Sequence, residues 1–299
     1  MMQIIWDGLF VGSFYALIAL GYSMVYGIIK LLNFAHGDIY MLGAFIGFIM
    51  LTSMGGLPGA LSIGALLVVL LVSMALTGGA GVLIERFAYR PLRKAPRLAV
   101  LITAVGVSFT LQYGVSAIMG PNPRSYPAQF RLEGDVFDIL GARISLPQVL
   151  LMAIAAILMI ALNTYIQKTS TGRAMRSISL DMKGSLLMGI NVNSVITRTF
   201  FIGSALAGAA GVMSGAYYGK IDFMMGFLIG LKAFTAAVIG GIGNIQGAML
   251  GGLVLGLLEA FGASVFGGEW RDVFSFVVLI LFLTLRPTGI LGERVTERV

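Results

Sequence analysis

Long apolar segments follow one another along the whole chain and restrict the folds that it can adopt. Five of them, at residues 8–29, 57–84, 98–119, 147–166 and 195–217, are assigned as helices that cross the hydrocarbon core of a bilayer, which takes roughly 20 residues. Four others lie at 37–53, 226–242, 246–266 and 272–286. The pattern predicts an all-α polytopic integral membrane protein whose single transmembrane domain occupies residues 1–299.

The composition excludes a soluble globular protein. Of the 299 residues, 58% are hydrophobic and 11% are charged, whereas soluble domains carry about 25% charged residues. The net charge of +7 lies in short connectors between the apolar segments, which indicates membrane topology and argues against a nucleic-acid partner. Cysteine is absent and His36 is the only histidine, so the chain has no thiol nucleophile and no cysteine- or histidine-rich metal site.

Basic connectors indicate which helix ends face the cytoplasm. The connector 85–97 contains five basic residues and one acidic residue, and the connector 169–191 is also basic, so both are predicted to be cytoplasmic. The connector 120–146 balances its charges and is predicted to be external. Nine crossings satisfy these assignments, with the N-terminus outside and the C-terminal tail inside. Because the shorter segments can be re-entrant or broken, the range is about 8 to 10 transmembrane helices.

The N-terminal residues and the external connector 120–146 each allow one further prediction. The opening sequence MMQIIWDGLF lacks a basic region, so we expect a first membrane helix there and no cleaved signal peptide. The external connector contains PNPRSYP at residues 121–127, and its three prolines are incompatible with a regular helix. This connector is expected to form an ordered loop that either lies against its own helices or touches a soluble partner.

Small residues recur at a spacing of four along several apolar segments. Such spacing allows two helices to approach closely in a membrane. The pairs crowd after residue 203, which predicts a tightly packed C-terminal half whose partner is either this chain's own helices or another subunit. The pairs are Gly8/Gly12, Gly43/Gly47, Ser204/Gly208, Gly211/Gly215, Gly215/Gly219, Gly226/Gly230, Gly247/Gly251 and Gly252/Gly256.

The segment 170–194 interrupts the apolar pattern with a helix that has two unlike faces. At about 100° per residue, one side forms an apolar stripe. The other side mixes charged and polar side chains with leucines. Such a helix either rests one side on the membrane domain and offers the other to a partner, or is a solvated loop helix. The stripe contains Met175, Ile178, Met182 and Leu186, and the opposite face contains Arg176, Ser179, Leu180, Lys183 and Leu187.

Polar residues inside or beside the apolar segments are the candidates for the translocation path or its gate. Asn33, His36 and Asp38 cluster between two apolar segments, where they either cap a helix or line the path. Lys232 and Glu259 lie at a similar depth in two antiparallel segments, about 10 Å from the outer ends. Because an ion inside a membrane is costly unless paired or hydrated, these two are predicted to pair or to face one aqueous cavity. A structural lock is favoured over a substrate contact.

Motifs for nucleotide or metal chemistry are absent from the sequence. The chain contains neither GxxxxGK[ST], which forms a P-loop, nor HExxH, which binds zinc. The glycines of residues 240–247 lack the spacing of a dinucleotide-binding turn and predict a tight or broken turn between two membrane helices. The sequence therefore predicts neither a catalytic site nor a metal site in this chain.

Five stretches along nearly the whole chain resemble those of one permease family. They are LNFAHGDIYMLGAF (32–45), IERFAYRPLR (84–93), the span from TGRAMRS to MGINV (171–192), GLKAFTAAVIGGIGNIQGAMLGGLVLG (230–256) and RPTGILG (286–292). In this order they are similar to the LivH-type permease subunit of branched-chain amino acid ABC importers. Their joint occurrence is far more specific than any single stretch.

The resemblance implies the transmembrane domain of an ATP-binding-cassette importer in the bacterial inner membrane. It implies inward movement of leucine, isoleucine or valine by alternating access. The implied partners are a homologous second permease subunit, two cytoplasmic ATPase subunits that bind ATP and Mg²⁺, and a periplasmic substrate-binding protein. The chain itself is expected to bind no cofactor.

The resemblance also gives the segment 170–194 the role of a coupling helix, which seats in a groove of the ATPase. The EAAxxxG signature of ABC importers falls on residues 183–189. Gly189 matches it, whereas Lys183 and Gly184 replace the usual acid and alanine, and Asp181 is the alternative source of an acidic contact. The residues expected to couple the chain to the ATPase are Arg173, Arg176, Leu180, Asp181, Lys183, Leu187 and Gly189.

Three alternatives stay open at this point. One is an ABC permease for urea, short-chain amides or another amino acid, because specificity in such importers lies mostly with the binding protein. Another is a secondary transporter driven by an ion gradient. It would usually carry several intramembrane carboxylates, whereas only Glu259 lies deep and Asp38 is marginal. A membrane-embedded enzyme is disfavoured by the single histidine and the missing cysteine.

Overall fold

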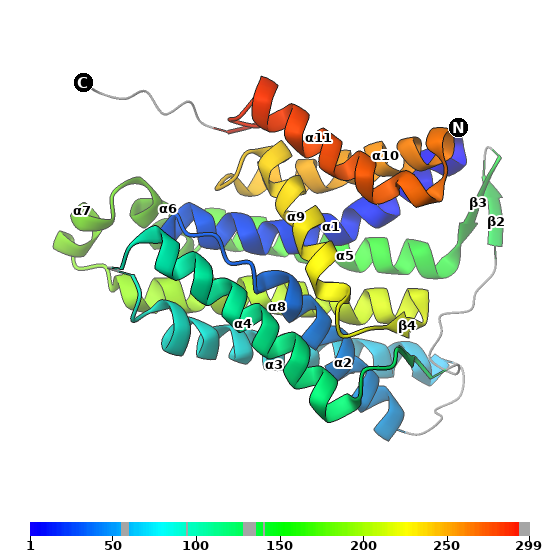
Figure 1. The fold of residues 1–299 in the computed structure, drawn as a ribbon, viewed down its shortest axis with the longest axis horizontal. Coiled ribbons are helices and arrows are strands. Elements are labelled where there is room, and N and C mark those ends of the chain that lie inside the picture. Colours follow the sequence, from blue (N-terminus) through cyan, green and yellow to red (C-terminus); the bar gives the residue numbers. More distant parts are fainter. Residues whose placement is uncertain (55–59, 94, 128–135, 140, 293–299) are drawn as a thin grey trace.

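Helices account for most of the chain that this computed structural model describes, which comprises residues 1–54, 60–93, 95–127, 136–139 and 141–292 (Figure 1). The predicted all-α membrane fold is confirmed, and each of the nine apolar segments corresponds to one helix. The helices are α1 (Met2–Ile29), α2 (His36–Ser53), α3 (Ala60–Ile84), the π-helix η1 (Glu85–Tyr89), α4 (Arg97–Met119), α5 (Leu146–Lys168), α6 (Ser170–Leu180), α7 (Met182–Leu187), α8 (Val192–Tyr218), α9 (Met225–Gly240), α10 (Ile245–Phe266), the 3-10 helix η3 (Gly268–Trp270) and α11 (Arg271–Leu285).

Seven helical stretches among the described residues are long and apolar enough to cross a membrane. They include α1, α2, α4, α5, α8 and α10, together with the continuous stretch Gly64–Tyr89 of α3 and η1. The remaining two apolar helices are shorter, since α9 has 16 residues and α11 has 15. At about 1.5 Å per residue, they fall short of the roughly 30 Å hydrocarbon core. The nine crossings therefore stay a prediction.

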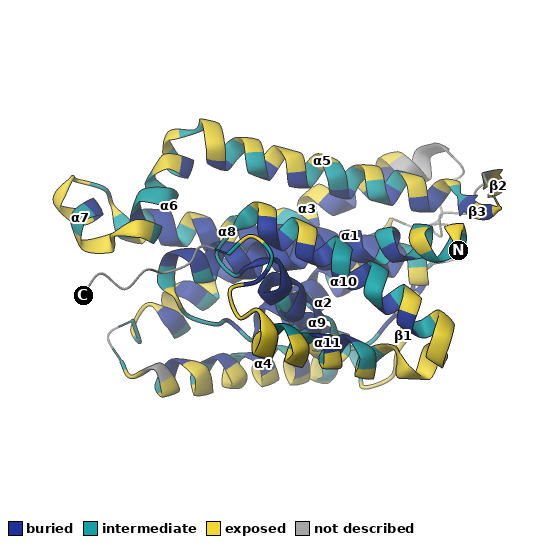
Figure 2. Cartoon of the chain, turned by 90° about the horizontal axis from the view of Figure 1, so that it is seen from above, coloured by how far each residue is buried: buried dark blue, intermediate teal, exposed yellow. Residues whose placement is uncertain are grey.

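The buried centre consists mainly of α1, α2, α8 and α9, and α4 and α5 lie at opposite edges (Figure 2). The central α1 and α8 carry apolar or small residues on all sides, as expected for a helix surrounded by other helices. The edge helix α4 buries one narrow stripe and exposes most of its apolar side chains, which suits a helix at the lipid boundary. The buried stripe of α4 consists of Val100, Ala104, Ser108 and Gln112.

Glycines bring the central helices together backbone to backbone. A Cβ atom on Gly12 of α1 would lie 2.9 Å from the carbonyl oxygen of Gly252 in α10. A Cβ on Gly43 of α2 would lie 2.4 Å from the carbonyl oxygen of Gly208 in α8. The predicted close packing is confirmed, and its partners lie in this chain. It is not confined to the C-terminal half, because α1 and α2 supply one side of each of these contacts.

Replacing Gly252 by Val should destabilise the protein strongly. A Cβ at this position would lie 2.4 Å from the backbone nitrogen and Cα of Ala16, and a backbone cannot turn aside as a flexible side chain can. Overpacking a tight core costs about 1–3 kcal/mol, and this contact belongs at or above the upper end. Thermal unfolding in detergent should show a clear drop in the midpoint. The matched control is Gly106→Ala on α4, where an added Cβ meets no atom within 4 Å. An unchanged midpoint for Gly252→Val would contradict the packing.

The two ends of the helical domain are built differently (Figure 1). At one end, the side chain of Gln3 accepts a hydrogen bond at 2.7 Å from the backbone of Arg143, in the hairpin of β2 (Val136–Ile139) and β3 (Ala142–Ser145). The opposite end carries both basic connectors. There Arg93 donates to Asn193 at 2.6 Å and pairs with the buried Glu85. Burial lowers the pKa of Arg93, and Glu85 opposes that effect.

The proline-rich connector folds back onto its own helices. Its strand β1 (Arg124–Ser125) pairs antiparallel with β4 (Lys220–Ile221). Tyr126 is buried, and its hydroxyl donates to the carbonyl oxygen of Ala44 in α2 at 2.6 Å. Contact with the chain's own helices is therefore confirmed for the described part of this connector. Residues 128–135 and 140, and the C-terminal residues 293–299 whose cytoplasmic location was predicted, lie outside the described residues.

Candidate functional site

The predicted coupling segment forms two short helices, α6 and α7, and not one. The backbone at Asp181 is extended, with φ −149° and ψ 105°, and this residue separates the two helices. The carboxylate of Asp181 accepts the backbone N–H of Lys183 at 2.9 Å, which caps α7. The hydroxyl of Thr169 likewise accepts the N–H of Gly172 at 3.1 Å and caps α6.

The break at Asp181 changes which side chains are buried. Met175 and Ile178 of α6 are buried, as the predicted apolar stripe requires. Met182 and Leu186 of α7 are exposed, so the prediction of one continuous stripe is wrong beyond Ile178. Because Asp181 is extended, α7 does not continue the helix of α6, and its side chains no longer face the same side. Helix α6 therefore supplies the apolar side that rests on the membrane domain, where it faces the end of α1 across a small recess.

The far end of this segment carries a group of exposed apolar side chains, which we call the apolar tip: Leu180, Leu186, Leu187 and Met188. Leu180 and Leu187 expose 83% and 87% of their surface, and Met188 exposes 84%. Helix α7 projects beyond the ends of the membrane helices (Figure 2). Gly189 follows with φ +80°, a conformation that favours glycine and ends the tip. Exposed apolar groups gathered on a projection are typical of a protein interaction site.

The charged residues of the segment divide into two kinds. Arg176 is half-buried and donates to the backbone carbonyl of Ile166 at the end of α5, so it anchors α6 to the membrane domain. Arg173 and Lys183 are exposed. A Cβ on Gly184 would lie 2.5 Å from Oδ2 of Asp181, so the capping carboxylate occupies the space that an alanine would need.

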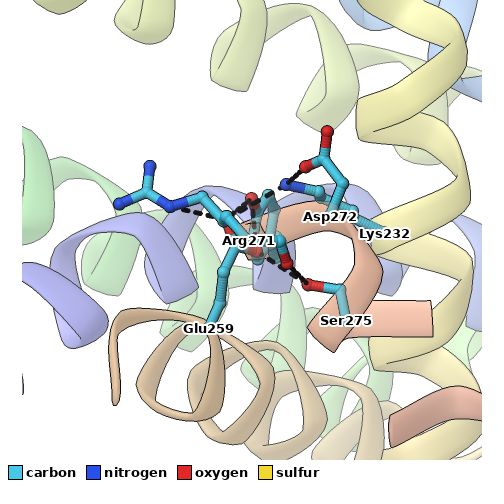
Figure 3. A network of polar contacts seen from close by, with 6 residues as sticks. Lys232, Glu259, Arg271, Asp272 and Ser275 are labelled. Carbon is cyan, nitrogen blue, oxygen red and sulfur yellow. Dashed lines mark hydrogen bonds and ion pairs between the residues drawn. The ribbon is translucent and has the colours of Figure 1, made fainter. Parts of the chain in front are cut away.

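A second group of functional candidates forms a buried ionic network (Figure 3). Lys232 of α9 donates to Oε1 of Glu259 in α10 at 3.0 Å, so the predicted pairing is confirmed. Glu259 is 2% exposed and has further partners. Its carboxylate accepts the hydroxyl of Tyr15 in α1 at 2.9 Å and that of Ser275 in α11 at 3.2 Å. The network thus ties α1, α9, α10 and α11 together.

Two further ions complete this network, and sequence reasoning missed both. Arg271 lies 3.3 Å from Oε1 of Glu259, and Asp272 lies 2.5 Å from Nζ of Lys232. Two positive and two negative groups therefore balance. Arg271 and Asp272 stand at the start of the last apolar helix, α11, which follows α10 after the short helix η3. Because α11 follows α10 closely along the chain, its first residues must lie near the end of α10, and this could have predicted their contact with the ions of α9 and α10.

The third group, Asn33, His36 and Asp38, lies around the start of α2. Helix α2 begins after Ala35 without a side-chain cap, so the capping interpretation of these residues is wrong. All three side chains are buried. The hydroxyl of Tyr89 donates to Oδ1 of Asn33 at 2.6 Å, and Nε2 of Gln112 donates to Oδ1 of Asp38 at 2.8 Å.

These three side chains do not converge on one point. Asn33 is hydrogen-bonded to η1 and Asp38 to α4. The ring of His36 packs edge-on against Tyr22 of α1, with 4.8 Å between the ring centroids. Each has one buried atom without a hydrogen-bond partner in the described structure: Nδ2 of Asn33, Nε2 of His36 and Oδ2 of Asp38. Among the described residues, no group of three or more histidine or acidic side chains could hold a metal ion.

Comparisons with known proteins give matches over nearly the whole chain. The family model described as "Branched-chain amino acid transport system / permease component" matches residues 4–283. The high-affinity branched-chain amino acid transport system permease protein BraD of Pseudomonas aeruginosa is 47% identical over 100% of this chain and 98% of its own length. The corresponding protein LivH of Escherichia coli K12 is 43% identical over 100% of this chain and 97% of its own length. Among solved structures, PsaBC from Streptococcus pneumoniae in complex with Fab aligns with 96% of this chain and 93% of its own at 12% identity. Its TM-score of 0.48 is too low to define a shared fold.

Proposed function

Because the chain belongs to the family of permease components of branched-chain amino acid transport systems, we propose that it forms the membrane pathway for importing leucine, isoleucine or valine. One observation carries the proposal: two high-affinity permeases of this kind match the whole chain at 47% and 43% identity. That likeness favours branched-chain amino acids over urea, short-chain amides or other amino acids. It also favours an ABC importer over a gradient-driven transporter.

The energy for import comes from partner subunits. The proposed complex contains a homologous second permease, two ATPase subunits that bind ATP and Mg²⁺, and a periplasmic binding protein. The apolar tip and the surrounding Arg173, Lys183 and Gly189 form the surface that seats in an ATPase subunit. Exposure of Leu180 and Leu187 supports this role, because these leucines face water unless a partner covers them. Arg176 and Asp181 support the surface from within, by anchoring α6 and capping α7.

The basic connectors give the proposed orientation in the bacterial inner membrane. Residues 85–97 and 170–194 lie in the cytoplasm, since positively charged connectors stay on that side. The N-terminus and the hairpin of β2 and β3 then face the periplasm, where the binding protein delivers its ligand. Lys232 and Glu259 act as a structural lock near that side, and Asn33, His36 and Asp38 lie along the path or its gate.

Co-expression of the chain with the neighbouring transport genes of its source tests the proposal. We expect the purified complex to contain two permeases, ATPase subunits in equal number and a binding protein that associates when loaded. Reconstituted in vesicles, it should take up leucine, isoleucine or valine only with ATP present. Uptake that follows an ion gradient without ATP, or accumulation by this chain alone, would contradict the proposal.

A further inference from the structure

Three buried carboxylates lie among the described residues, and Glu85 pairs with Arg93. The other two, Glu259 and Asp38, have very different surroundings. Glu259 has Lys232 at 3.0 Å and Arg271 at 3.3 Å, so its charge is compensated within the chain. Asp38 is 1% exposed, and within the described residues no Lys, Arg or His nitrogen lies within 4.0 Å of its carboxylate. We propose that Asp38 is a binding site for a cationic group that arrives from outside the chain, the α-ammonium of the transported amino acid.

The contacts of Asp38 leave one oxygen for such a ligand. Oδ1 accepts from Nε2 of Gln112 at 2.8 Å, and the same amide also donates to Ser108 at 3.1 Å. Oδ2 is buried and has no hydrogen-bond partner among the described residues. The polar neighbours on α4 are thus uncharged. They hold the carboxylate in place but carry no charge. The first turn of α9, where a Cβ on Gly226 would lie 3.0 Å from Oδ1, adds the partial positive charge of a helix N-terminus but no full countercharge.

The charge of an aspartate distinguishes it from its two polar neighbours. Asn33 and His36 also have one unpartnered buried atom each. Both can be neutral, and a neutral group that misses one hydrogen bond is tolerated far better than an unpaired ion. An ionised carboxylate inside a membrane protein is strongly unfavourable without a countercharge, and such residues usually serve the transported substrate or a proton. Asp38 is therefore the member of this group that points to a ligand.

The fold offers a way to reach this carboxylate. Gln112 and Ser108 belong to the narrow buried stripe by which α4 packs on the domain. On its remaining sides α4 is exposed, and added Cβ atoms on Gly106 and Gly114 would meet nothing within 4 Å. Helix α4 is thus fastened near its middle by the hydrogen bond between Gln112 and Asp38. Asp38 also packs against the start of α9, near Gly226. A ligand therefore reaches Asp38 only when α4 moves away, and α4 takes no part in the glycine contacts between α1 and α10 and between α2 and α8.

The ligand class rests on the proposed function, which supplies a substrate with one α-ammonium group. An ammonium donates hydrogen bonds to a carboxylate and compensates its charge, so it satisfies Oδ2 and the net charge together. An alkali cation shares the positive charge, and the experiment must separate the two sources.

The test uses the full complex reconstituted in vesicles. ATP is supplied on the side of the ATPase subunits, and a saturating concentration of amino-acid-loaded binding protein is supplied on the opposite side. Asp38→Asn keeps the shape and the hydrogen bond but removes the charge. We expect its leucine uptake to fall at least about tenfold, while ATPase subunits stay bound and ATP hydrolysis continues. Asp38→Glu should recover part of the uptake. Uptake by Asp38→Asn within about twofold of the wild type would overturn the proposal, because a protonated aspartate and an asparagine would then be equivalent.

Three controls distinguish the loss of the Asp38 charge from other causes of reduced uptake. Gln112→Met removes the fastening of α4 but leaves the carboxylate, so it should lose less uptake than Asp38→Asn; an equal loss would show a packing role and overturn the proposal. Asp7→Asn makes the same charge change on the first turns of α1 and should transport normally. Uptake by the wild type that requires Na⁺ or K⁺, with that requirement lost in Asp38→Asn, would overturn the ammonium assignment in favour of an ion site.

The remaining outcomes separate this inference from the proposed function. If Asp38→Asn fails to assemble, labelling of Asp38 by a hydrophobic carbodiimide in the wild-type complex replaces it. Leucine with binding protein and ATP should slow that labelling, and an unchanged rate would overturn the proposal. A wild-type complex that takes up no branched-chain amino acid would instead refute the proposed function.

Discussion

Changing Leu187 to Glu is expected to release the ATPase subunits from the purified complex and to lower ATP-driven uptake at least about tenfold. Leu187 is 87% exposed on the apolar tip, and burying a leucine in a partner's groove contributes about 1.5–3 kcal/mol. Glutamate loses that contribution and adds the cost of burying a charge. About 1.4 kcal/mol corresponds to a tenfold change in affinity, so both effects together exceed tenfold. The measurement is the ratio of ATPase to permease after affinity purification.

A matched control places the same kind of change at the other end of the molecule. Val136 on β2 is 59% exposed, and Val136→Glu should leave the ATPase ratio unchanged. Gly189→Glu should weaken the ATPase as Leu187→Glu does, since its φ of +80° disfavours any side chain. Full retention of the ATPase in Leu187→Glu, together with normal uptake, would show that the tip does not carry the contact.

The second large effect is expected from the ionic network around Glu259. Changing Lys232 to Met, or Glu259 to Met, leaves buried charge less well compensated, and breaking a buried pair costs about 3–5 kcal/mol. The other partners in the network reduce this cost, so each single change should lower the free energy of unfolding by about 2–4 kcal/mol. The double change removes one charge of each sign together. It should cost clearly less than the two single changes added, as measured by thermal unfolding in detergent.

The charge swap of Lys232→Glu with Glu259→Lys is a poor test of this pairing. Asp272 lies 2.5 Å from the lysine nitrogen and Arg271 lies 3.3 Å from the glutamate. A swap would bring like charges together at both places, and so it should not restore stability. Strict additivity of the two methionine changes would contradict coupling between Lys232 and Glu259.

The sequence predicted the helices well because each is set by a local property. A run of apolar residues in a membrane must form a helix, since only a helix satisfies its own backbone there. All nine segments correspond to helices, and the depth argument correctly paired Lys232 with Glu259. Glycine spacing predicted close packing but not its partners. Which helices meet depends on the whole chain, as the contact of Gly12 with Gly252 illustrates.

The candidate sites were harder to predict where a single backbone conformation, or a contact with a residue far away in the sequence, determines which side chains are buried and paired. The stripe through Met175 and Met182 assumed a continuous helix, and the extended backbone at Asp181 ended it. Asp38 resembled a capping residue because it lies in the first turn of a helix. Its hydrogen-bond partner, Gln112, is 74 positions away, and no local pattern indicates that contact.

The backbone contacts between α1 and α10, and between α2 and α8, set a mechanical limit on the protein. Side chains between two helices can change rotamer and let one helix slide, but glycine faces have no such freedom. A Cβ on Gly203 of α8 would lie 3.1 Å from the Cα of Gly21 in α1, so the two pairs are themselves in backbone contact. We therefore expect these four helices to move as one body, and a conformational change to fall to the helices packed around them.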